Sequence, residues 1–145
     1  MKSKKGLKVI LFAMAVLAFI TGTTYTQTRR GQGHGMPKYD TATEVTLKGT
    51  VTKVESHVGR MGWNGTHLVV SFGAEKLTVH VGPSNYVAQQ GFSFADGDQI
   101  EVTGSRINFE GSDVLIAREI TKGDKVLTLR NSQGIPAWSR NKWRY

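Results

Sequence analysis

The sequence predicts an all-β fold: a five-stranded, OB-fold-like closed barrel with one short helix between strands 3 and 4. The first observation behind this is the order of elements between Thr43 and Thr121: a long strand, a tight hairpin, a short helix after Gly82-Pro83, and two more strands. The second is that the first strand and the hairpin alternate apolar and polar residues, the period of a strand with one buried face. Barrels of this type bind ligands through one face and its loops, so a binding module is the leading hypothesis.

The first strand is predicted over about residues 44–56. Its apolar residues alternate with threonine and lysine until Lys53-Val54, where the alternation slips and indicates a β-bulge. Gly49 suits a sharp bend. Small barrels need such irregularities in order to close.

The hairpin over residues 67–81 fixes its own register. A two-residue loop at Gly73-Ala74 places Leu68 opposite Val79, and a slip of one residue would set apolar positions against polar ones along the whole hairpin. The same register places His67 directly opposite His80 on the polar face.

The remaining elements are shorter. A helix is predicted over residues 85–90, with Ser84 as its N-cap and Gly91 as its C-terminal cap. Further strands are predicted at residues 99–109, 114–120 and 126–129. The residues expected to close the barrel end near the helix are Tyr86, Val87, Phe92 and Phe94.

Residues 1–24 are predicted to be a signal peptide or an N-terminal membrane anchor. A basic start, KSKKGLK, precedes an apolar run from Val9 to Ile20, which is shorter than the roughly 20 residues that a spanning helix needs. No A-x-A cleavage pattern follows, so cleavage and retention as an anchor both stay open. In either case we expect an exported domain, periplasmic or anchored to the inner membrane and facing the periplasm. Residues 25–42 are polar and glycine-rich, which predicts a flexible linker.

The formal net charge of +8 lies mostly outside the predicted domain, residues 43–134, which holds nine basic and ten acidic residues. A barrel that followed a phosphate backbone would show a basic stripe of its own. The charge distribution therefore argues against nucleic acid as the partner of the barrel, and nucleic-acid binding is kept as an alternative function. The absence of cysteine excludes a disulfide in the oxidising compartment.

Several runs of sequence resemble a group of small exported bacterial OB-fold-like proteins of largely uncharacterised function. These runs are GTVTKVES, GWNGTHLVV, TVHVGPSNYV, GDQIEVTGSRI and VLIAREITKGDKVLTLRNSQGIPAW. The resemblance covers about residues 37–139 and implies the same fold and compartment. Members of this group are sometimes labelled DNA-binding by similarity of fold, and the resemblance implies no established activity.

His67 and His80 are the sharpest candidate site. Directly opposed residues in an antiparallel pair have Cβ atoms about 5 Å apart, within reach of one metal ion. A third ligand would come from His57, Met61 or Glu55, in or near the loop that joins the first two strands. This gives an alternative function, a periplasmic protein that binds a divalent transition metal; otherwise no cofactor is expected. The competing interpretation is a pair of exposed strand histidines chosen for polarity.

The loop His57–Gly65 also borders the expected ligand face. Its Arg60 and Trp63, flanked by glycines, are placed to pair with and stack on a ligand. The alternative for Trp63 is packing on the rim of the barrel.

The C-terminal segment, residues 135–145, interleaves cations with aromatic rings. This pattern suits an anionic membrane surface, a nucleic acid or an acidic partner. The alternative is a short disordered terminus. The residues of this predicted interaction tail are Trp138, Arg140, Lys142, Trp143 and Arg144.

No catalytic motif stands out. The chain contains no G-x-S-x-G, no H-E-x-x-H and no G-x-x-x-x-G-K-[ST]. We therefore expect a non-catalytic binding or interaction module of the bacterial cell envelope, with an envelope protein or an anionic ligand as partner. Membrane association would run through the N-terminal segment.

Overall fold

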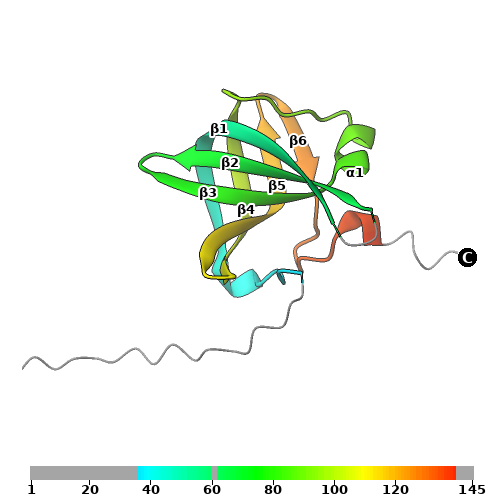
Figure 1. Cartoon of the computed structure of the whole chain (residues 1–145), viewed down its shortest axis with the longest axis horizontal. Helices are drawn as coiled ribbons and strands as arrows, with labels where there is room; N and C mark the ends of the chain where they lie inside the picture. The colour runs from blue at the N-terminus through cyan, green and yellow to red at the C-terminus, as the bar shows by residue number, and fades with distance from the viewer. Residues whose placement is uncertain (1–35, 60–61, 140–145) are drawn as a thin grey trace, which may run out of the picture. The chain divides into compact units, whose positions relative to one another are not determined.

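The fold is seen in a computed structural model, which describes residues 36–59 and 62–139. Their strands form one sheet in the order β3-β2-β1-β4-β5-β6, and an additional parallel pairing of β3 with β5 closes it (Figure 1). The elements are η1 (Thr41–Thr43), β1 (Glu44–Val58), β2 (Asn64–Phe72), β3 (Glu75–Pro83), α1 (Ser84–Gln89), β4 (Gln99–Phe109), β5 (Ser112–Lys122) and β6 (Lys125–Thr128). The prediction of a closed five-stranded barrel with one short helix between β3 and β4 is confirmed, and β6 extends the sheet beyond β5.

The long first strand, β1, belongs to both halves of the barrel. Its first half pairs with β4 and its second half with β2. The register shifts between Val51 and Lys53, so the bulge lies at Thr52, just before its predicted position. A Cβ atom on Gly49 would lie 2.5 Å from the carbonyl oxygen of Ser71, so only glycine admits this close approach of β1 to β2.

The β2–β3 hairpin has the predicted register. Leu68 pairs with Val79 and His67 with His80, around a turn at Gly73-Ala74 in which Gly73 has a φ of 64°. Leu68 and Val79 are fully buried. Because successive residues of a strand point to opposite faces, His67 and His80 lie on the outer face of the barrel.

The helix α1 begins one residue earlier than predicted, and its N-cap differs. The N-cap is Pro83, which makes no side-chain capping bond, and Ser84 is the first helical residue. The prediction of Ser84 as N-cap was wrong because the Ser84 hydroxyl instead bonds to the hydroxyl of Thr66 on β2, at 2.9 Å. Gly91 follows the last turn with a φ of 69°, as expected for a residue that ends a helix.

The core fills the barrel with aliphatic side chains. Val87 and Phe92 are buried in it, and Tyr86 and Phe94 pack against it, as predicted for the barrel end. Its fully buried residues include Leu68, Val70, Val79, Val102, Leu115, Ile120 and Leu129.

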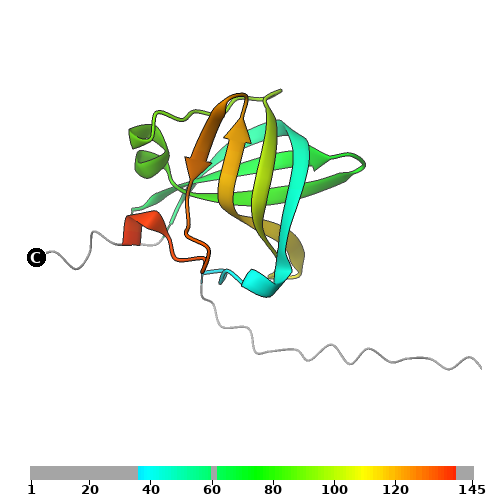
Figure 2. The same cartoon turned by 180° about the vertical axis from the view of Figure 1, so that it is seen from behind.

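The segment after β6 packs against the barrel, with Leu129 buried in its core. It returns along the barrel to a short turn near α1 (Figure 2). There Trp138 packs beside Tyr86, with ring centroids 5.4 Å apart, and over Gly82, whose Cβ would lie 2.6 Å from the Trp138 ring. A larger residue at position 82 would displace this tryptophan.

Candidate binding face

Three imidazole rings lie side by side across the outer face of β1, β2 and β3. The ring centroids of His57 and His67 are 4.5 Å apart, and those of His67 and His80 are 4.2 Å apart. At the far side the Phe109 ring, from the end of β4, meets His80 edge-on at 6.3 Å. We call His57, His67 and His80 the histidine row.

The strand pairings place these side chains together. His67 pairs with His80 across the hairpin and with Glu55 on β1. His57 follows Glu55 by two residues and so points to the same face of β1. Its Nε2 lies 3.4 Å from Glu55 Oε2, and Glu55 also forms an ion pair with Lys53 at 2.7 Å.

The row is electrically neutral at its centre. Burial, with the neighbouring positive charges of His67, Arg130 and His57, lowers the pKa of His80 to about 4. Burial and the His57 charge also lower the pKa of His67. Hydrogen bonds from Lys53 and His57 hold the pKa of Glu55 below its usual value. At pH 7 the rings of His67 and His80 therefore each present one acceptor and one donor nitrogen.

Trp63 lies at one edge of this face, where the β1–β2 loop meets α1. Trp63 is about half exposed, at 49%, and Val58 nearby in the chain is 77% exposed. A hollow of about 400 Å³ opens beside the indole. Its lining residues are Gly62, Trp63, Asn64, Ser84 and Asn85.

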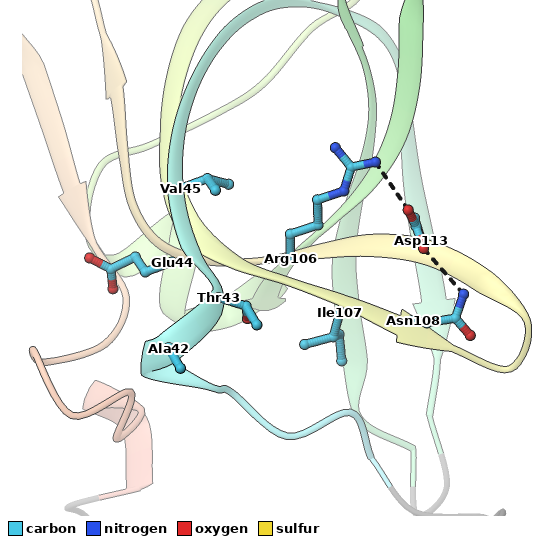
Figure 3. Close-up of a pocket in the computed structure, with 8 residues that line it drawn as sticks. All are labelled: Ala42, Thr43, Glu44, Val45, Arg106, Ile107, Asn108 and Asp113. Carbon is cyan, nitrogen blue, oxygen red and sulfur yellow. Dashed lines mark hydrogen bonds and ion pairs between the residues drawn. The ribbon is translucent and has the colours of Figure 1, made fainter. Parts of the chain in front are cut away.

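A second cavity, of about 370 Å³, lies between the start of β1 and the β4–β5 hairpin (Figure 3). On its β4–β5 wall Arg106 pairs with Asp113 at 3.0 Å and also with Glu75 on β3. Asn108 donates to the same Asp113 carboxylate, at 3.1 Å, and Glu44 points away from Arg106. Because each of its charged groups already has a charged partner, this cavity is a structural junction, and the histidine row is the better candidate site.

The structure brings His57, His67 and His80 together and sets Trp63 at the loop. Trp138 lies against the barrel, where its ring stacks on the Arg130 guanidinium at 5.0 Å. Arg60 and the tail residues Arg140, Lys142, Trp143 and Arg144 lie outside the described residues, as does Met61.

Phe109 is a member of this face that sequence reasoning missed. The available signal was an aromatic residue directly before the Glu110-Gly111 turn. Its partner, however, lies on β3, and only the fold brings the two together.

Neighbouring rings of the row are tilted to one another by 35° and 41°. Among residues 36–59 and 62–139, no three His, Cys, Asp or Glu side chains are arranged, as they stand, to hold a metal ion. The same part of the chain contains no helix with the length and apolar character needed to cross a membrane. The predicted signal or anchor, residues 1–24, lies outside it.

A model of the MamS/MamX magnetosome protein family matches residues 43–127, which spans the barrel from the start of β1 into β6. The chain belongs to the MamS/MamX magnetosome protein family. This membership fits the expectation of a small bacterial protein. No curated protein matches the chain.

Among solved structures, the MamS/MamX chain is similar to the N-terminal domain of PriB protein from Thermoanaerobacter tencongensis, described as dimeric. The two are 19% identical with a TM-score of 0.44, and the alignment covers 58% of this chain and 99% of that one.

Proposed function

We propose that this MamS/MamX family member is an exported, non-catalytic binding module of the bacterial envelope that serves the magnetosome. Its ligand face would be the outer face of β2 and β3 with the β1–β2 loop. The observation that carries the proposal is the histidine row with Phe109, which lies on the face where OB barrels bind their ligands. The magnetosome enters through the family description.

The composition of the face favours an envelope protein as partner. Trp63, about half exposed, lies in the loop that borders the row, and Phe109 meets His80 edge-on at its far side. An apolar and aromatic centre with few charges is typical of the buried part of a protein–protein interface. The near-neutral barrel gives no comparable support to a phosphate-rich partner.

Site-specific photo-crosslinking in the native host tests this face. A photoreactive amino acid replaces Lys76, an exposed residue of β3 that alternates with His80 on the outer face, or Lys48, its matched control on the β1–β4 side. We expect a discrete protein adduct from position 76 and none from position 48. Adducts from position 48 alone, or from neither position, would overturn the proposal.

Export is tested separately by fusing alkaline phosphatase to the C-terminus of the full chain. We expect phosphatase activity in cells, and its loss when residues 1–24 are deleted, because the enzyme matures outside the cytoplasm. Activity that survives the deletion would contradict the role given to this segment.

A further inference from the structure

We infer that the histidine row binds one divalent transition-metal ion, with His67 and His80 as ligands from the hairpin and His57 as the third ligand. The site lies on the proposed ligand face but needs no protein partner. It can therefore be tested with the metal alone.

Rigid strand pairing, and not a loop, sets the spacing of the three imidazoles. His67 and His80 are paired across the hairpin, and their centroids lie 4.2 Å apart; His57 adds a third ring at 4.5 Å from His67. Imidazole nitrogens bind zinc at about 2.0–2.1 Å, which puts two ligating nitrogens of a tetrahedral site about 3.3 Å apart. Centroids at these separations leave room for nitrogens of neighbouring rings to reach this spacing.

The adjustment that chelation needs is a turn of the rings. In the structure the rings are tilted by 35° and 41° to one another, and their nitrogens do not share a centre. The outer torsion of a histidine side chain is broad, so each ring can turn a nitrogen toward the same solvent-side position with the backbone fixed.

One carboxylate lies beside the row. Glu55 contacts His57 Nε2, which leaves Nδ1 of that ring free for the ion and supplies a carboxylate to orient it. Lys53, paired with Glu55, is the other charged group on this part of β1.

The donor set also predicts which ions bind. Imidazole nitrogens without thiolate suit Cu(II), Ni(II) and Zn(II), and the chain contains no cysteine. We expect Cu(II) to bind more tightly than Ni(II) or Zn(II), in the usual order for nitrogen ligands, and Mg(II) not to compete.

Calorimetry on the purified full-length chain with each ion alone tests the site. We expect one ion per chain, with affinity at least tenfold lower in His67→Gln and in His80→Gln and reduced in His57→Gln. His34→Gln is the matched control, because His34 is the fourth histidine of the chain and lies outside the row. Three results would each overturn the inference: no binding by the unmodified chain, an unchanged affinity in His67→Gln and His80→Gln, or a loss of affinity in His34→Gln.

A readout on the unmodified chain protects the test against variants that fail to fold. In NMR spectra of the imidazole protons, Zn(II) should shift the signals of three of the four histidines together, with saturation at one equivalent. Shifts confined to a single histidine, or shared equally by all four, would contradict the row as the site. Because no partner is present, failure here leaves the crosslinking result untouched.

Discussion

At the scale of single residues, Glu44 joins the start of β1 to β5. Its carboxylate accepts two hydrogen bonds from Arg118, at 2.9 and 3.0 Å, and a third from the Tyr39 hydroxyl. These bonds lower the pKa of Glu44, and burial together with Glu44 raises the pKa of Tyr39 to about 12. The cluster is therefore most stable when the carboxylate is ionised and the phenol is protonated.

Replacing Glu44 by Gln should remove an acid-sensitive part of the stability. Because the folded pKa of Glu44 lies below its unfolded value of 4.5, its contribution is present above about pH 4.5 and is lost as pH falls through the folded pKa. We expect Glu44→Gln to lower the free energy of unfolding by about 1 kcal/mol at pH 7 and by much less at pH 3. Urea denaturation at both pH values measures the difference.

Glu119→Gln on β5 is the control for this prediction, because no ion pair involving Glu119 is seen in the described part of the chain. A Glu44→Gln effect of equal size at pH 3 and pH 7 would show that packing, and not the ionised pair, stabilises this junction.

At the scale of elements, Arg130 bridges the barrel where the pairing of β3 with β5 ends. That pairing stops at His80 and Ile116, and the Arg130 guanidinium donates to the carbonyl oxygens of the next residue on each strand, Val81 at 3.4 Å and Ala117. Burial lowers the pKa of Arg130 to about 10, so the side chain is still charged at neutral pH. It replaces strand-to-strand hydrogen bonds that the diverging backbones no longer make.

Arg130→Met should therefore destabilise the barrel. The change leaves two backbone carbonyl groups without their charged donor, and we expect a loss of about 2–3 kcal/mol in the free energy of unfolding at pH 7. Arg130→Lys should fall between, because an ammonium keeps a charged donor but lacks the planar guanidinium that stacks on Trp138. Lys125→Met, at an exposed position of β6, serves as control. A loss below about 0.5 kcal/mol for Arg130→Met would refute the bridging role.

At the scale of the whole molecule, the positive charge lies in the arms and not in the barrel. Residues 43–134 are close to neutral while the chain as a whole carries +8. Within the described residues, the Arg106 and Arg118 side chains are both engaged in ion pairs. The barrel surface therefore has only a weak positive electrostatic potential with which to attract a polyanion.

Any affinity for single-stranded DNA should consequently depend on the two arms. We expect weak, strongly salt-dependent binding by the full chain, which is largely lost when Arg29, Arg30 and Lys38 of one arm and Arg140, Lys142 and Arg144 of the other are all changed to Gln. Replacement of Lys48, Lys53 and Lys76 on the barrel should leave it nearly unchanged. Fluorescence anisotropy over a salt series measures the DNA affinity of both variants. Binding that survives loss of the arm charges would favour nucleic acid as a ligand of the barrel.

The predictability of this protein differs from one feature to the next. The hairpin register followed from Leu68, Val79 and a two-residue glycine turn, because alternation and turn chemistry act between neighbours in sequence. The N-cap of α1 did not follow, because the Ser84 hydroxyl is bonded to Thr66, which lies eighteen residues away on another strand. Local rules fail where a side chain has a distant competitor for its hydrogen bond.

The sequence by itself determined the order of elements and the placement of His67 opposite His80, since both depend on a period of two and on a short turn. Only the tertiary structure decided that His57 and Phe109 join them and that Arg130 fills the gap between β3 and β5. Those contacts join strands that closure of the barrel brings together. Closure depends on the bulge at Thr52 and on the close approach at Gly49, whose combined geometry no local pattern specifies.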